Sequence, residues 1–302
     1  MKFENVLVTG AGGYLGSRVL SQLRGRCRVT GLDMKNPAGI EDFIEADMTD
    51  LDAMRAAIEG RDAVIHIAAL ANIWAGGPQA IMAVNQMGTW NIAEASREAG
   101  VSRVVQCSSD SVVGFTVMSG NMLAPDFLPV DEFHTRRPTD PYALSKKLGE
   151  ETMRSFVQRG AFEAVVLRPV FVLYPEIECE VIARAKAPDT YKDVTAGGPN
   201  PAGGGLVWHY VDPEDAARAF VLALEMDKIQ DGFDTFFVSG PTNLAPEPTL
   251  ERMKNRLGKL PELRDPELYR NNPNAPLYDL SRARDILGYV PQHDRRGLLY
   301  ET

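Results

Sequence analysis

The sequence is poor in the features that mark several classes of protein. It holds only three cysteines in 302 residues, at the widely separated positions Cys27, Cys107 and Cys179. An odd number of isolated cysteines, without a CxxC motif or a Cys/His cluster, indicates neither a disulfide framework nor a zinc site. We therefore expect reduced thiols, no bound metal and a cytoplasmic protein.

Long apolar runs and basic runs are missing as well. The longest mostly apolar stretch, residues 63–75, is interrupted by His66 and Asn72 and is shorter than the ~20 residues that span a bilayer. No basic segment followed by an apolar stretch stands near Met1, so neither a signal peptide nor membrane association is predicted. The net charge is −9, and no basic run exceeds two residues. Such a chain repels a phosphate backbone, which disfavours nucleic-acid partners.

Short apolar runs alternate with helical patterns through the first half of the chain. Runs rich in β-branched residues predict strands at 6–9, 28–32, 63–68, 103–107 and 164–167. Between them, apolar residues at helical spacing predict helices at 14–23, 51–58, 79–99 and 142–159. This alternation predicts an α/β fold with a Rossmann-type, doubly wound parallel sheet.

The pattern weakens after about residue 170. A helix after Asp212, a strand before Gly240 and short helices at 250–257 and 281–287 are still expected. The segment 196–205 (AGGPNPAGGG) predicts a mobile loop or lid. We predict a nucleotide-binding Rossmann domain and a small C-terminal substrate-binding lobe. The first covers 1–170 and is rejoined by about 205–240, and the lobe is formed by 171–204 and 241–302.

A glycine motif follows the first predicted strand, at 10–16 (GAGGYLG). Glycines at this spacing allow a tight turn that brings backbone N–H groups and a helix N-terminus up to a pyrophosphate. A purely structural turn is the alternative, but Asp33 ends the second strand about 20 residues on, where a ribose-binding carboxylate belongs. That carboxylate favours NAD, because it would repel the 2′-phosphate of NADP; the nearby Lys35 leaves NADP open as the second choice.

Tyr142 and Lys146 form the only YxxxK motif of the chain. On a helix these residues share one face, so the ammonium can approach the phenol. A tyrosine with a pKa near ~10 needs about 4 kcal/mol of help to act as a base at neutral pH. One cation at ~4 Å and an effective dielectric constant of ~20 supplies about that much. The pair can therefore take a proton from an alcohol while hydride leaves its carbon.

Taken in order, these motifs resemble the extended short-chain dehydrogenase/reductases, and more narrowly the NAD-dependent epimerase/dehydratase family. The segments 84–91 (VNQMGTWN), 107–114 (CSSDSVVG) and 167–169 (LRP) resemble further blocks of that family, and the likeness covers residues 3–170. The resemblance implies that Ser109 binds the reacting oxygen and that Tyr142 is the general acid/base. It also implies that Lys146 holds the nicotinamide ribose and lowers the tyrosine pKa.

The motifs and the resemblance together define two sets of expected contacts. Cofactor contacts are expected at Gly10, Gly13, Tyr14, Leu15, Gly16, Asp33, Asp47, Met48, Ala68, Ala69, Asn85, Tyr142 and Lys146. Substrate contacts are expected at Ser109, Asp110, Ser111, Phe115, Tyr142, Trp208 and His209. For Asp47 and Met48 an ordinary turn is the alternative, and for His209 an interior position in a strand.

Departures from the family pattern bear on the substrate. Ser111 stands where the family's dehydratases carry glutamate, which argues against dehydration. Nucleotide-sugar epimerases carry a diphosphate-binding arginine near the block that corresponds to residues 206–212 (LVWHYVD), and no arginine is present there. We therefore expect a smaller substrate, such as a sugar, a sugar acid or a related polyol.

Three functions are compatible with these motifs. The favoured one is an NAD-dependent dehydrogenase acting on a sugar-like hydroxyl. The alternatives are a redox-neutral epimerase, acting on a sugar or a nucleotide sugar, that retains its NAD, and an NAD(P)-binding regulatory protein without catalysis. The resemblance also implies a homodimer that pairs the helices at 79–99 and 142–159.

Overall fold

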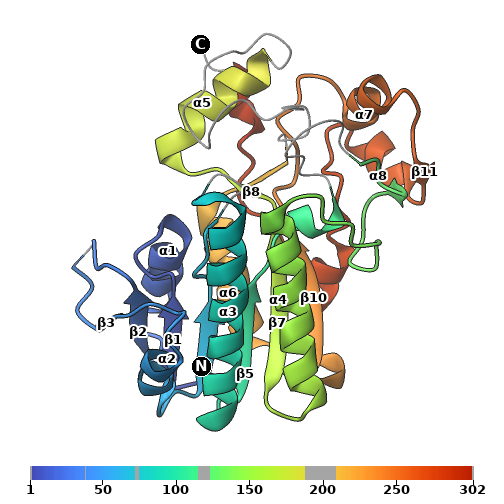
Figure 1. Cartoon of the computed structure of the whole chain (residues 1–302). Coiled ribbons are helices and arrows are strands. Elements are labelled where there is room, and N and C mark those ends of the chain that lie inside the picture. Colours follow the sequence, from blue (N-terminus) through green and yellow to red (C-terminus); the bar gives the residue numbers. More distant parts are fainter. Residues whose placement is uncertain (1, 38, 72–74, 115–122, 188–208, 301–302) are drawn as a thin grey trace. The chain divides into compact units, whose positions relative to one another are not determined.

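The computed structural model describes residues 2–37, 39–71, 75–114, 123–187 and 209–300 (Figure 1). The chain forms two compact units. The first unit comprises Met1–Ser109, Pro141–Arg168 and Ala217–Phe236, and the second comprises Asp110–Asp140, Pro169–Ala216 and Phe237–Thr302. The predicted domain boundaries differ from this division mainly at residues 110–140, whose pairing partners lie near the C-terminus. The predicted loop at 196–205 lies outside the described residues.

The central sheet has seven strands in the order β10-β7-β5-β4-β1-β2-β3. Its strands are β1 (Asn5–Thr9), β2 (Arg28–Asp33), β3 (Phe43–Glu45), β4 (Ala63–His66), β5 (Arg103–Cys107), β7 (Glu163–Pro169) and β10 (Phe233–Val238). The strand pairs from β3 through β7 are all parallel. Every residue of β4 and β5 is buried, as expected for strands covered on both faces. The predicted fold class is confirmed.

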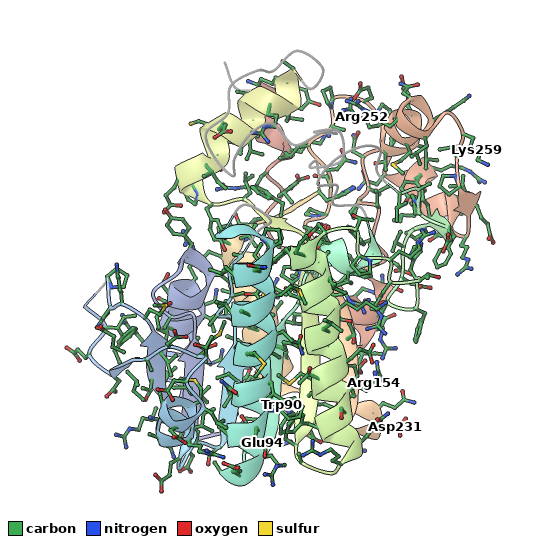
Figure 2. The ribbon with its side chains drawn as sticks, in the orientation of Figure 1. Trp90, Glu94, Arg154, Asp231, Arg252 and Lys259 are labelled. Atoms are coloured by element: carbon green, nitrogen blue, oxygen red, sulfur yellow. The ribbon has the colours of Figure 1, made fainter. Side chains whose placement is uncertain are left out.

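Helices connect these strands, and the predicted ones are close to those observed. They are α1 (Tyr14–Leu23), α2 (Leu51–Ile58), α3 (Gly77–Glu98), α4 (Pro141–Gln158) and α6 (Pro213–Glu225). The first two match the prediction residue for residue. The next two begin one or two residues earlier, because Pro78 and Pro141 are accommodated in their first turns. α3 and α4 pack side by side, and Trp90 of α3 contacts Phe156 of α4 edge to face with ring centroids 5.2 Å apart (Figures 1 and 2).

The strand predicted at 63–68 ends two residues earlier than expected. The apolar run at 63–68 predicted a strand as far as Ala68, whereas β4 ends at His66. The backbone N–H groups of Ile67 and Ala68 donate to the side-chain hydroxyl of Thr9 (both 3.2 Å). The chain therefore leaves the ladder two residues before its apolar run ends.

The second unit is built from short elements. Its strands pair as β6 (Phe127–Leu128) with β11 (Glu262–Leu263) and β8 (Phe171–Val172) with β9 (Tyr210–Val211). Its helices include α5 (Pro175–Lys186), α7 (Thr249–Leu257) and α8 (Pro266–Asn271), with single turns at Asp110–Val113, Ala283–Leu287 and Arg296–Tyr300. A core cluster in this unit joins α5, β9 and the C-terminal turn. The helix after Asp212 and the strand before Gly240 are present as α6 and β10.

Candidate active site

The glycine loop after β1 has a backbone that only glycine can follow. Gly10 has φ +74°, and a Cβ placed on it would lie 2.7 Å from the backbone nitrogen of Ala68. A Cβ on Gly16 would overlap the carbonyl oxygen of Gly10. Gly13 precedes α1 and brings no side chain over its first turn. The loop therefore exposes backbone and a helix N-terminus in the manner that suits a pyrophosphate.

Asp33 is held beside this loop. One carboxylate oxygen accepts the backbone N–H of Gly12 (3.0 Å) and the other accepts that of Met34 (2.7 Å). A Cβ on Gly12 would lie 2.8 Å from the carbonyl oxygen of Lys35, so the chain after β2 passes close to the loop. Each oxygen keeps a lone pair for a ribose hydroxyl. The loop and this carboxylate thus fit a dinucleotide.

The segment after β3 is fixed on α3. Asn91 donates to the carbonyl oxygens of Met48 (3.0 Å) and Thr49 (2.9 Å). The Met48 side chain is buried, and it lies so close to Gly88 that a Cβ there would be 2.6 Å from its sulfur. The Asp47 carboxylate accepts the N–H of Thr49 (2.8 Å), which makes a tight turn. Adenine binding by Asp47 and Met48 stays a prediction, and any part that Met48 plays would come from its backbone.

The expected catalytic pair lies in the first two turns of α4. Lys146 is only 6% exposed; its Nζ donates to the carbonyl oxygen of Cys107 (2.8 Å) and lies 5.7 Å from the centre of the Tyr142 ring. Burial lowers the pKa of the Lys146 ammonium. Ser109, also buried, follows β5 two residues after Cys107. The helix therefore places a cation between its tyrosine and the end of β5.

Asn85 of α3 connects the segment after β4 to the start of α4. Its side-chain oxygen accepts the N–H of Leu70 (2.8 Å), and its amide nitrogen donates to the Leu70 carbonyl (3.2 Å) and to Ser145 Oγ (3.0 Å). Ser145 Oγ in turn donates to the carbonyl oxygen of Tyr142 (2.8 Å). Both protons of the Asn85 amide are thus used within the protein. The expected nicotinamide contact of Asn85 stays a prediction.

Two buried charged residues near this helix were missed as site residues by the sequence reasoning. Glu150, four residues after Lys146, makes a bidentate ion pair with Arg168 (2.8 and 2.7 Å). It also accepts a hydrogen bond from Ser108 (2.6 Å), the neighbour of Ser109. The sequence signal that could have identified Glu150 is its i, i+4 spacing from Lys146, which places its carboxylate on the same face of the helix.

Some of the expected substrate residues belong to the second unit. Asp110 accepts a hydrogen bond from the buried Tyr278 hydroxyl (2.7 Å), and Ser111 is buried. His209 packs edge to face on the Tyr278 ring (5.5 Å), and burial lowers the pKa of its imidazole to about 3. His209 also lines a small cavity with Asn243, Thr249 and Arg252, among other residues. Phe115 and Trp208 lie outside the described residues.

Taken together, these features define a class of protein. A parallel sheet with a glycine turn after β1, a carboxylate at the end of β2 and a buried YxxxK motif on α4 is the arrangement of an extended short-chain dehydrogenase/reductase. The model of the NAD dependent epimerase/dehydratase family matches residues 6–236, more than half of the chain. The chain belongs to this family, which confirms the predicted resemblance.

Several known proteins are similar to this chain. A uronate dehydrogenase of Pseudomonas putida is 32% identical over 171 residues, which cover 55% of this chain and 60% of that protein. A UDP-glucose 4-epimerase of Rhizobium leguminosarum bv. trifolii is 26% identical over 97% of this chain and 94% of its own. The structure of a short-chain dehydrogenase/reductase superfamily protein from Agrobacterium tumefaciens with bound NAD is 26% identical, with a TM-score of 0.70 and coverage of 98% and 95%. The chain thus spans less than two thirds of the length of that uronate dehydrogenase.

Neither a metal-binding cluster nor a membrane-spanning helix is found among the described residues. In the part of the chain that the structure describes, no group of three or more His, Cys, Asp or Glu side chains could hold a metal ion. None of the helices in those same residues combines the length and the apolar character needed to cross a bilayer.

Proposed function

We propose that the protein is an NAD-dependent oxidoreductase that moves hydride between a hydroxyl-bearing carbon of a sugar-like substrate and the nicotinamide. The observation that carries the proposal is the buried Lys146, fixed by Cys107 and close to the Tyr142 ring, in the same unit as the glycine loop and Asp33. The similarity to a uronate dehydrogenase supports a sugar as substrate.

The residues that we expect to hold NAD all belong to the first unit. The backbone of the glycine loop and the first turn of α1 would bind the pyrophosphate, and the Asp33 carboxylate would bind the adenosine ribose. Ala68 and Ala69 would line the cofactor, and Lys146 would hold the nicotinamide ribose. When bound, NAD supplies the hydride acceptor. NAD is favoured over NADP because Asp33 is tied by two backbone N–H groups and cannot easily turn away from a 2′-phosphate.

Proton transfer is assigned to the side chains at the start of α4. Tyr142, as phenolate, takes the proton of the substrate hydroxyl, and Ser109 hydrogen-bonds the same oxygen. The Lys146 ammonium stabilises the phenolate, while its bond to Cys107 holds it in place. Burial of Lys146 strengthens this electrostatic effect, because less water screens the two charges.

A redox-neutral epimerase is the second candidate. It is favoured by the UDP-glucose 4-epimerase relative, which aligns over nearly the whole chain. Against it stands the absence of arginine between residues 206 and 212, where the family's diphosphate-binding residue would be expected. A binding protein without catalysis is the least favoured alternative, because the Tyr142–Lys146 pair is retained.

A substrate panel separates these candidates. Uronic acids, neutral sugars, polyols and UDP-sugars are each incubated with NAD⁺, and NADH is followed by its absorbance. NADH that accumulates with an uncharged sugar or a sugar acid supports the dehydrogenase. Conversion of a UDP-sugar to its epimer without net NADH supports the epimerase, and tight binding of a UDP-sugar in calorimetry contradicts the smaller substrate.

We further propose that the protein is a homodimer formed through α3 and α4. The support is a set of apolar side chains that these helices leave exposed, namely Met87 (51%), Trp90 (40%) and Leu144 (39%) (Figure 2 labels Trp90). Light scattering on the purified protein measures the mass directly. A monomer at micromolar concentration would contradict this proposal.

A further inference from the structure

Three buried polar side chains form a row in the first unit, and none of them is among the expected cofactor contacts. Thr9 ends β1, His66 ends β4 and Thr89 lies on α3; they are 0%, 3% and 5% exposed. Thr9 Oγ1 is 2.9 Å from His66 Nδ1, and His66 Nε2 is 3.1 Å from Thr89 Oγ1. The row therefore joins two neighbouring strands to the helix that follows the second of them.

The hydrogen bonds around Thr9 determine where the histidine proton lies. Thr9 Oγ1 accepts the backbone N–H groups of Ile67 and Ala68, which occupy its two lone pairs. Its own proton is then donated to His66 Nδ1, so the imidazole carries its proton on Nε2 and donates it to Thr89. Burial, the main cause, and the positive charge of Lys146, the second cause, lower the pKa of His66 to about 3, so the ring is neutral near pH 7.

This row controls the backbone that faces the glycine loop. Ile67 and Ala68 leave the β4 ladder and bond to Thr9 instead. They pass so close to Gly10 that a Cβ there would lie 2.7 Å from Ala68 N and 3.1 Å from the carbonyl carbon of Ile67. Leu70, two residues later, is held at both its N–H and its carbonyl by Asn85. Residues 67–70 are therefore fixed at both ends, and Thr9 fixes the end at the glycine loop.

We propose that Thr9 and His66 are positioning residues for the dinucleotide, with Thr9 holding residues 67–68 against the glycine loop and His66 orienting the Thr9 hydroxyl. Neither side chain touches the cofactor in this assignment. Their effect passes through the backbone of Ala68 and Gly10, so the inference rests on the cofactor role proposed for those two residues.

Substitutions of Thr9 test the role in binding. Thr9→Val keeps the shape but leaves two buried N–H groups and the His66 Nδ1 without their partner. We expect the Kd for NAD to rise roughly tenfold or more, while kcat at saturating NAD stays within about threefold of wild type. Thr9→Ser keeps the hydroxyl and should restore the wild-type Kd. Thr30→Val is the matched control, because Thr30 is a buried threonine of β2 whose hydroxyl accepts from Arg61 (2.8 Å).

The outcomes separate this inference from the proposed function. If Thr9→Val binds NAD like wild type and merely lowers Tm, as Thr30→Val does, the positioning role is wrong while the proposed function stands. If Thr9→Ser fails to restore the Kd, the hydroxyl is not the responsible group. If the wild-type protein itself does not bind NAD, both the proposed function and this role are overturned.

A spectroscopic measurement tests the direction of the hydrogen bonds without the cofactor. In long-range ¹H–¹⁵N spectra of the protein labelled on histidine, the ring that responds to Thr9→Ser should be a neutral imidazole with its proton on Nε2. It should stay so between pH 8 and about pH 5, because its pKa lies far below. A proton on Nδ1, or an imidazolium at pH 6, would overturn the assignment.

Discussion

The two units differ in how their buried polar groups find partners. In the first unit, Thr9 and His66 pair across adjacent strands of a regular βα succession, and the buried Arg103, which donates to the carbonyl oxygens of Leu224 and Met226, is an exception to that local pairing. In the second unit, the partners come from segments far apart in the chain: Tyr278 bonds Asp110, 168 positions away, and Tyr210 bonds Asp294, 84 positions away. The fold of the first unit is therefore specified mainly by its regular βα sequence pattern, and that of the second unit mainly by hydrogen bonds between segments far apart in the chain.

Each unit also contains a buried histidine, and the two histidines differ in their hydrogen bonds. His66 and His209 are both buried, and burial lowers the pKa of each to about 3. Both ring nitrogens of His66 are hydrogen-bonded. His209 Nδ1, by contrast, has no hydrogen-bond partner among the residues that the structure describes. A histidine that orients its neighbours through both ring nitrogens can thus be distinguished from one that is only enclosed by packing.

Tyr142→Phe should have the largest effect on activity. Loss of the phenol removes the general base, so we expect kcat to fall by about a thousandfold while the Kd for NAD changes little. Steady-state kinetics on the substrate found in the panel, with NAD calorimetry, measure both quantities. Tyr278→Phe is the matched change in the second unit, where it removes one hydrogen bond to Asp110 and should leave kcat within about tenfold. Equal losses in the two variants would contradict the assignment of Tyr142.

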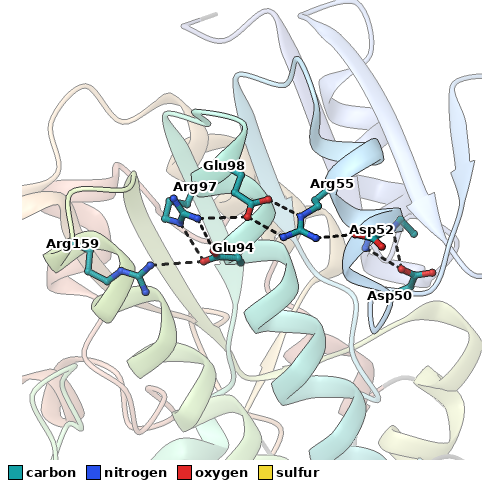
Figure 3. Close-up of polar contacts among 8 residues, drawn as sticks. Asp50, Asp52, Arg55, Glu94, Arg97, Glu98 and Arg159 are labelled. Atoms are coloured by element: carbon teal, nitrogen blue, oxygen red, sulfur yellow. Dashed lines mark hydrogen bonds and ion pairs between the residues drawn. The ribbon is translucent and has the colours of Figure 1, made fainter.

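Glu150→Gln should have the largest effect on stability. It leaves the buried Arg168 without its charged partner, which costs about 3 kcal/mol or more in free energy of unfolding. Denaturant titration measures this. The control is Glu98→Gln, in the surface network where Arg55 bonds both Glu98 (2.7 and 3.0 Å) and Asp52 (Figure 3). Those charges are exposed and screened by water, so little change is expected. A loss for Glu98→Gln as large as that for Glu150→Gln would contradict the contrast.

Much of the first unit was predictable from its sequence, and the exceptions have a physical cause. Helices 14–23 and 51–58 follow from apolar periodicity alone, because each buries one face on the sheet. The end of β4 was not predictable in this way. Ile67 and Ala68 are as apolar as strand residues, and only the Thr9 hydroxyl, 58 and 59 positions earlier, takes their N–H groups out of the ladder.

The candidate site was predictable where a motif carries it and not elsewhere. The glycine loop, Asp33 and the Tyr142–Lys146 spacing are local patterns. Glu150 and Arg168 could be read as ordinary surface charges, because their pairing joins two separate elements, α4 and β7. Tyr278 gave no signal at all, since its contacts with Asp110 and His209 join segments that no periodicity relates.

Lys146→Met should lower activity less than Tyr142→Phe does. The phenol remains, but without the cation the phenolate forms only at higher pH. We therefore expect kcat at pH 7 to fall by about thirtyfold, with part of the loss recovered as the pH is raised. The pH–rate profile of the variant measures this. Lys147→Met, one residue along the same helix, is the matched control and should keep the wild-type profile. A loss for Lys146→Met that is the same at every pH would contradict an electrostatic role.

His209→Leu should have the smallest effect, visible in the pH dependence of stability. Between about pH 3 and pH 6.5 the unfolded chain protonates this imidazole and the folded chain does not. The contribution of the neutral His209 to the stability of the folded protein is therefore complete above pH 6.5 and is lost as the pH falls. Each pH unit in that window costs about 1.4 kcal/mol per histidine. His209 has fewer hydrogen-bonded neighbours than His66, so we expect the leucine variant to keep its affinity for NAD. Its free energy of unfolding should depend less steeply on pH, by about one proton. Urea titrations between pH 7 and pH 5 measure the slope, and an unchanged slope would mean that His209 is protonated in the folded protein.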